Sequence, residues 1–144
     1  MTLNPFDPEG RFYWGLAFLA MGAIFAVLGV LITFNAVSFT WRAEPVEVVV
    51  VDLVEREGQN STLLAPVFEA VTAEGPIRDL SSAASLRPLH GLGDRVPGFI
   101  DPAVPRIETA ATLRSMRRLG YALGALGLGL GLFGLYLLRR PKPA

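Results

Sequence analysis

Residues 119–138 read LGYALGALGLGLGLFGLYLL and contain no charged side chain. An α-helix rises about 1.5 Å per residue, so as a helix this run would be about 30 Å long, the thickness of the hydrocarbon core of a bilayer. A second uncharged run, FYWGLAFLAMGAIFAVLGVLITFNAVSFTW, covers residues 12–41. Soluble cores do not need apolar runs of this length. The sequence therefore predicts transmembrane helices over residues 12–40 and 119–138 and argues against a freely soluble globular protein.

Side chains that prefer the membrane–water interface flank both runs. Tryptophan and tyrosine rings are apolar with polar tips, and arginine side chains are long enough to reach lipid headgroups. The predicted interface residues are Tyr13, Trp14, Trp41, Arg114, Arg117, Arg118, Arg139 and Arg140, with Phe39 close to Trp41. A cleavable signal peptide is a weaker interpretation of the first run, because its apolar segment spans about 7–15 residues and follows a basic segment. Here residues 1–11 include Asp7 and Glu9.

Glycine recurs at regular intervals along both predicted helices. The predicted packing residues are Gly15, Gly22, Ala26 and Gly29 in the first helix and Gly120, Gly124, Gly127, Gly131 and Gly134 in the second. Lipid provides no hydrophobic force that pulls helices together, but small residues let two backbones approach closely. The shared seven-residue repeat predicts that the two spans pack on each other as an antiparallel hairpin. Two other interpretations are open: one stripe faces a helix of another protein, or glycine is simply common in membrane helices.

The segment between the spans, residues 41–105, is predicted to form a small β-rich domain outside the membrane. Short β-branched and apolar stretches alternate in it with turn residues such as Gly58 and Gly75. The predicted strands, about four in number, cover residues 46–54, 63–72, 77–80 and 95–100. Proline has no N–H to donate to a neighbouring strand, so Pro97 indicates an edge strand or a bulge in the last of them.

Residues 106–118 are basic and are predicted to form a juxtamembrane helix that continues into the second span, and residues 1–11 and 139–144 are predicted tails. The predicted fold class is a membrane α+β protein, a two-helix transmembrane hairpin with an inserted small antiparallel β domain. Both tails then lie on the same side of the membrane. Basic residues flank both ends of the second span and do not settle the orientation; the basic C-terminal tail slightly favours an extracytoplasmic β domain.

Short motifs around the β segment give the chain a family resemblance. They are Trp41-Arg42-Ala43 after the first span, the Val-rich run 46–51, Pro66-Val67-Phe68, Gly93 with Val96, and Phe99-Ile100-Asp101-Pro102-Ala103-Val104-Pro105. On these residues the chain resembles the bacterial membrane proteins of domain of unknown function 3592, which place a small β-rich domain between two apolar helices. The motif residues carried over are Pro66, Phe68, Gly93, Phe99, Asp101, Pro102 and Pro105. The resemblance implies this architecture and a bacterial inner membrane location, and it implies no particular activity.

The composition offers little for catalysis or for nucleic-acid binding. Cysteine is absent, His90 is the only histidine and is interpreted as a loop residue, and 13 basic residues balance 13 acidic ones. The chain has no basic surplus for a nucleic-acid partner and no sequence cluster typical of a metal or cofactor site. No ionisable residue lies within either span, which argues against a channel or a transporter acting alone.

We therefore expect a non-catalytic integral membrane protein with an accessory or assembly role. Its expected partners are the lipid bilayer and either another membrane protein, for example of a respiratory or photosynthetic complex, or further copies of itself. The alternative is a membrane-anchored sensor whose β domain binds a ligand. A pocket lined by Phe68 and Phe99 would favour the sensor, and a filled β core would count against it.

Overall fold

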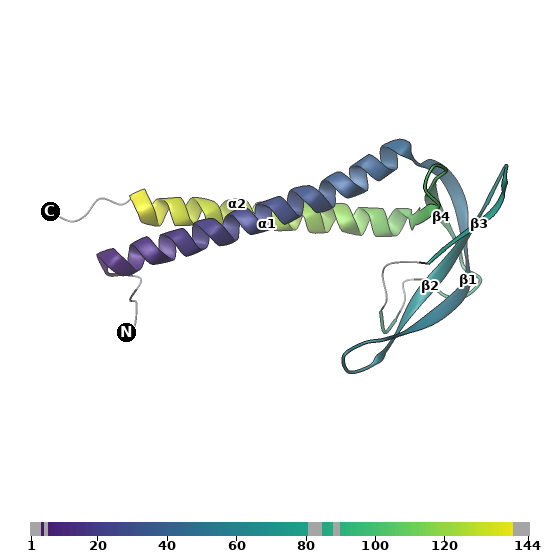
Figure 1. Cartoon of the computed structure of the whole chain (residues 1–144), viewed down its shortest axis with the longest axis horizontal. Helices are drawn as coiled ribbons and strands as arrows, with labels where there is room; N and C mark the ends of the chain where they lie inside the picture. The colour runs from purple at the N-terminus through teal and green to yellow at the C-terminus, as the bar shows by residue number, and fades with distance from the viewer. Residues whose placement is uncertain (1–3, 5, 81–84, 88–89, 140–144) are drawn as a thin grey trace. The chain divides into compact units, whose positions relative to one another are not determined.

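The computed structural model describes residues 4, 6–80, 85–87 and 90–139 of the chain (Figure 1). These residues divide between two compact units. The helix unit comprises Met1–Ala36 and Met116–Ala144, and the β unit comprises Val37–Ser115. The predicted interface residue Arg140 and the rest of the predicted C-terminal tail beyond Arg139 lie outside the described residues.

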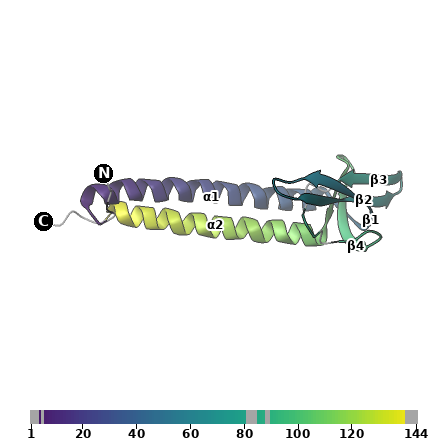
Figure 2. The same cartoon turned by 90° about the horizontal axis from the view of Figure 1, so that it is seen from below.

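Two long helices make up the helix unit. Helix α1 covers Pro8–Arg42 and helix α2 covers Ala110–Arg139, and within this unit they run side by side in opposite directions (Figures 1 and 2). α1 begins at Pro8, where a missing N–H costs no helical hydrogen bond, and Glu9 in its first turn complements the helix dipole. α1 therefore begins within the predicted tail 1–11.

Both helices are long and apolar enough to cross a membrane, as the uncharged runs predict. The last turns of α1 and the first turns of α2 belong to the β unit rather than to the helix unit. The predicted antiparallel β-rich segment between two apolar helices is confirmed at this level.

The β unit is built on one five-stranded antiparallel sheet in the order β3-β2-β1-β4-β5. Its strands are β1 (Glu44–Glu57), β2 (Thr62–Thr72), β3 (Gly75–Leu80), β4 (Arg95–Asp101) and β5 (Arg106–Thr109). The long central strand β1 pairs with β4 along residues 44–49 and with β2 along residues 48–57. The register with β2 shifts between Val50 and Asp52, and such an irregularity bends a strand.

All five strands contribute to one core. Its buried members are Val48, Val50, Phe68, Ala70, Ile100 and Ile107, and the partly buried Val46, Leu53, Ile77 and Val96 pack against them. The sheet curls, and its two edge strands approach each other. The backbone N–H of Ile107 on β5 donates a hydrogen bond to Oδ2 of Asp79 on β3 at 2.9 Å. The curl gives a single sheet one enclosed apolar face.

The structure corrects two predictions about the strands. Residues 106–109 form β5 rather than the first turn of a juxtamembrane helix, so the sheet has five strands and extends past residue 105. Ile100 and Ile107 pair across β4 and β5 and are both buried, and this burial explains why the segment is a strand.

Pro97 lies in a strand that is neither at the sheet edge nor bulged in its pairing with β1. Its position is still compatible with the lack of a backbone N–H in proline. β5 pairs with β4 only from Gly98 onward, so Pro97 has a strand partner, Glu47, on one side alone. The missing N–H is tolerated because this part of β4 is locally an edge.

Candidate functional site

The two glycine stripes lie against each other in the helix unit, backbone to backbone. A Cβ added at Gly22 would lie 2.5 Å from the amide nitrogen of Gly131 and 2.6 Å from the carbonyl oxygen of Gly127. A Cβ added at Gly29 would meet Gly124 and Gly120 in the same way, at 2.6 and 2.7 Å. Real Cβ atoms do not fit at such distances. The two helices of the antiparallel hairpin can approach this closely because glycine has no side chain, as expected for helices that associate in lipid.

Burial follows the seven-residue repeat along both helices. The buried positions on it are Gly15, Gly22, Gly29 and Ala36 in α1 and Gly120, Gly127 and Gly134 in α2. Seven residues is the period at which two helices keep the same faces together along a supercoil. The other predicted packing positions, Ala26, Gly124 and Gly131, are not fully buried. The backbone of Ala26 lies against Gly127, whereas a Cβ on Gly124 or Gly131 would meet nothing within 4 Å.

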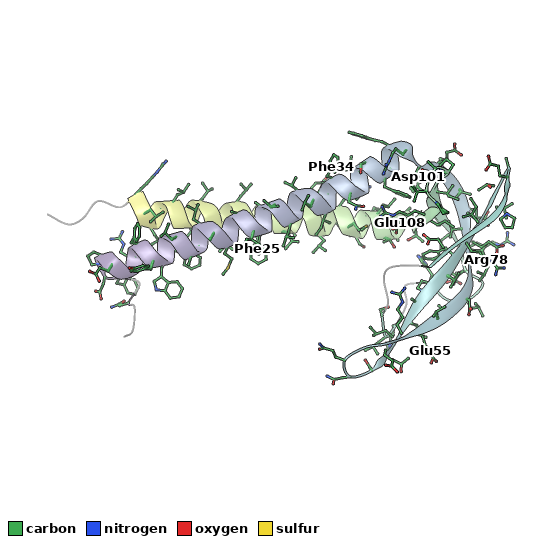
Figure 3. All side chains as sticks on the ribbon, viewed as in Figure 1. Phe25, Phe34, Glu55, Arg78, Asp101 and Glu108 are labelled. Atoms are coloured by element: carbon green, nitrogen blue, oxygen red, sulfur yellow. The ribbon has the colours of Figure 1, made fainter. Side chains whose placement is uncertain are left out.

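Large apolar side chains cover the remaining surface of the helices and point outward (Figure 3). They include Ile24, Val30, Phe34, Leu128 and Leu132, each more than half exposed. Within the most apolar window of each helix only 17% of α1 and 11% of α2 is buried. A core helix of a soluble protein is mostly buried, so this exposure separates the hairpin from that class.

The predicted interface side chains that the structure describes are exposed. Tyr13, Trp14 and Trp41 are exposed, and so are Arg114, Arg117, Arg118 and Arg139. Phe39 is the exception, because its ring is fully buried in the β unit under the guanidinium of Arg106, 4.6 Å away. Phe39 is a packing residue and not an interface anchor.

The predicted motif residues occupy separate places in the β unit. Pro66 and Phe68 are buried in β2, and Phe68 belongs to the core. Gly93 has a φ of +84°, which favours glycine, and its N–H donates to the carbonyl of Val50 at 2.8 Å. Phe99 is half-buried in β4 and lines a hollow whose lining does not include Phe68.

Asp101 organises the Asp-Pro-x-x-Pro motif. Its side chain is only 6% exposed, and its Oδ1 accepts a hydrogen bond from the N–H of Ala103 at 3.0 Å, which holds the turn. Its Oδ2 lies 3.9 Å from Nε of Arg42 at the end of α1. Pro102 and Pro105 are exposed. The motif is thus a structural turn that connects β4 to β5 and contacts the end of the first helix.

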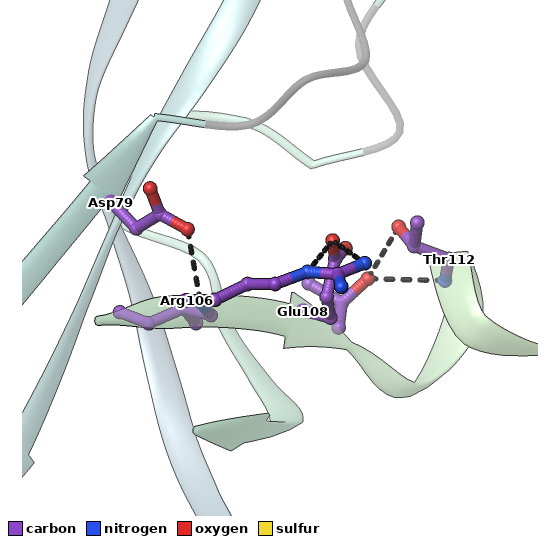
Figure 4. Close-up of polar contacts among 6 residues, drawn as sticks. Asp79, Arg106, Glu108 and Thr112 are labelled. Carbon is purple, nitrogen blue, oxygen red and sulfur yellow. Dashed lines mark hydrogen bonds and ion pairs between the residues drawn. The ribbon is translucent and has the colours of Figure 1, made fainter. Parts of the chain in front are cut away.

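A polar cluster around β5 was not predicted (Figure 4). Arg106 directs Nε and Nη2 to Oε1 of Glu108, each at 3.1 Å, and its guanidinium lies over the Phe39 ring. Thr109, fully buried, accepts a hydrogen bond from the N–H of Thr112 at 3.1 Å, which makes it the cap of α2. The sequence signal for this cap is Thr109 itself, because threonine is a favoured residue directly before the first turn of a helix.

Chemistry-bearing side chains do not converge in the part of the chain that the structure describes. No group of three or more His, Asp or Glu side chains there could hold a metal ion. His90 is half-buried, and its Nε2 has no hydrogen-bond partner among the described residues. The close packing of the glycine hairpin and its exposed apolar surface are therefore the features on which a function can be argued.

Comparison of the chain with protein-family models, with curated proteins and with solved structures finds no match. The functional argument consequently rests on the geometry of the two units themselves.

Proposed function

We propose that the chain is a non-catalytic integral membrane protein of the bacterial inner membrane, with both helices spanning the bilayer. One observation carries this proposal: the helices pack on each other through glycine while their large apolar side chains remain exposed. In water that surface would drive aggregation, whereas in a bilayer it faces lipid tails. The helices have the length for this role, 35 and 30 residues.

The proposed role is accessory: the protein packs against a larger membrane complex or against further copies of itself. The glycine stripes are already occupied by each other, which argues against the alternative that one stripe receives a foreign helix. A partner would meet the outer faces of the helices or the β unit. The same architecture supports, as a proposal, kinship with the family of domain of unknown function 3592.

Native mass spectrometry of the full chain, extracted from its membrane in mild detergent, tests the accessory role. We expect a defined complex with another membrane protein or a defined oligomer. Deleting the protein should then lower the yield of that complex without abolishing its chemistry. A monomer with no co-purifying partner, in several mild detergents, would overturn the accessory role and leave membrane insertion to be judged separately.

The sensor alternative has one supporting observation. A hollow of about 700 Å³ opens between β1 and β4, lined among others by Pro45, Glu47, Arg95 and Phe99, and Arg95 is paired with Glu47 at 3.3 Å. The core beside Phe68 is filled by side chains from all five strands, which counts against a ligand inside the sheet. We therefore place the accessory role first.

A further inference from the structure

We propose that the end of the hairpin where α1 begins and α2 ends binds one anionic phospholipid, with its phosphate on Arg11 and an acyl chain along an aromatic wall. This inference rests on the proposed membrane placement of the helices. It concerns a cavity within the helix unit and is independent of the accessory role.

The cavity lies between the first turns of α1 and the last turns of α2 and measures about 510 Å³. Apolar side chains line it almost entirely, and among the residues that the structure describes Arg11 is the only charged one in its wall. The apolar lining residues are Phe6, Trp14, Phe18, Phe133, Tyr136 and Leu137. A volume of this size lies within the usual range of roughly 300–1,000 Å³ for small-molecule sites.

The aromatic wall is continuous across the two helices. The ring of Phe18 on α1 meets the ring of Phe133 on α2 edge to face, with 5.2 Å between centroids. Trp14 lies 5.9 Å from Phe18, and Tyr136 stacks on Phe133 at 6.5 Å. Interlocked rings hold such a wall in place without filling the space in front of it. An acyl chain is the ligand chemistry that matches a long apolar surface of this kind.

Arg11 supplies the opposite chemistry at the edge of this wall. Its Nη2 is buried and has no hydrogen-bond partner among the described residues. The nearby carboxylates of Asp7 and Glu9 are exposed and form no ion pair with it in the described part of the chain. A buried guanidinium nitrogen with no acceptor is costly. A phosphate supplies two acceptor oxygens in the geometry that guanidinium prefers.

A lipid fits these observations better than a free phosphate ion. A free ion would use Arg11 alone and leave the aromatic wall uncovered, whereas a phospholipid joins a phosphate to an apolar chain in one molecule. Tyr13 and Trp14 mark this end of the hairpin as the level of the headgroups in the proposed membrane placement. The proposed ligand of this site is therefore a lipid with a net negative headgroup.

Quenching of Trp14 fluorescence by lipids brominated on the acyl chain tests the proposal. The full chain with Trp41→Phe has Trp14 as its only tryptophan. It would be reconstituted in phosphatidylcholine vesicles, into which brominated phosphatidylglycerol or brominated phosphatidylcholine is titrated. We expect the anionic lipid to associate at the Trp14 site about fivefold more tightly, the preference that one arginine gives near a membrane surface.

Matched variants assign the preference to Arg11. Arg11→Gln should reduce it to near unity and Arg11→Lys should retain part of it, whereas Arg139→Gln removes a charge outside the cavity wall at the same hairpin end and should leave it unchanged. Equal quenching by both lipids, or an equal loss in the Arg139 variant, would overturn the lipid site. Loss of the preference on adding millimolar inorganic phosphate would assign the site to a free anion. Absence of quenching by either lipid would instead contradict the membrane placement.

Discussion

Gly93 forms a turn in the β unit that requires a left-handed backbone conformation. Its φ of +84° lies in the left-handed region, and a Cβ added there would meet nothing within 4 Å. Substitution would therefore be penalised by backbone conformation alone. Two backbone hydrogen bonds join this turn to Val50 of β1: the N–H of Gly93 donates to the carbonyl of Val50, and the N–H of Val50 donates to the carbonyl of Asp94.

We predict that Gly93→Ala lowers the stability of this turn by about 1–2 kcal/mol, the cost of a left-handed conformation for an alanine. Gly91→Ala is the matched control, since Gly91 has no positive φ and its Cβ would make an ordinary 3.7 Å contact with Asp94. Hydrogen exchange of the Val50 amide in the full chain in detergent micelles measures the difference. Equal exchange rates in the two variants would show that Gly93 is not needed for its conformation.

Single residues also explain where the sequence failed as a guide. The segment around Arg106 is basic and precedes an apolar run, so on local grounds it reads as the start of a helix. In the structure Thr109 caps α2 and the residues before it pair with β4, which lies earlier in the chain. The partners that make Arg106–Thr109 a strand include Asp79, 28 residues away from Ile107. Local periodicity carries no information about such partners.

At the scale of elements, the glycine repeat shows what a local pattern does predict. A seven-residue spacing fixes which positions share one face of a helix, and the two faces do meet in the hairpin. The spacing cannot tell how far one helix is displaced along the other. That displacement places Gly127 between Gly22 and Ala26, and it leaves the Cβ positions of Gly124 and Gly131 open.

We predict that Gly127→Leu separates the two helices, because even a Cβ there would collide with the carbonyl oxygen of Gly22 at 2.7 Å. The interaxial distance should increase by roughly 1–3 Å toward the 8–10 Å that ordinary side chains impose. Spin labels at the exposed positions Ala17 and Leu132 would report the change by pulsed electron paramagnetic resonance. The chain has no native cysteine to compete for the label.

Gly129→Leu is the control for this experiment. Gly129 is exposed, and a Cβ there would meet nothing within 4 Å, so the same addition of volume in the same helix should leave the distance unchanged. If the two leucine variants give equal distances, close glycine contact does not hold the hairpin. The helix propensity gained by replacing glycine is the same in both, and it cancels from the comparison.

At the scale of the whole molecule, the sequence predicts the division into two helices and a sheet better than it predicts the contacts within the sheet. The long uncharged runs become two helices, and the mixed segment between them becomes an antiparallel sheet. Both follow from composition over many residues. Where the two edge strands approach each other, Asp79 of one accepts a hydrogen bond from Ile107 of the other, and the buried Phe39 ring lies under Arg106. Each of these long-range contacts joins an apolar residue to a charged one, Asp79 or Arg106, whose type alone indicates an exposed surface.

The proposed membrane topology predicts that the β unit and the N-terminal end of α1 lie on opposite sides of the bilayer. Asn60→Cys and Asp7→Cys each place one cysteine at an exposed position of an otherwise cysteine-free chain. With an extracytoplasmic β unit, a membrane-impermeant maleimide should label Asn60→Cys in intact spheroplasts and should label Asp7→Cys only after lysis. The reverse pattern would show a cytoplasmic β unit and keep the two-span arrangement. Labelling of both before lysis would contradict two spans, because in the proposed hairpin one crossing separates the loop from each end, so the loop and the ends cannot lie on the same side.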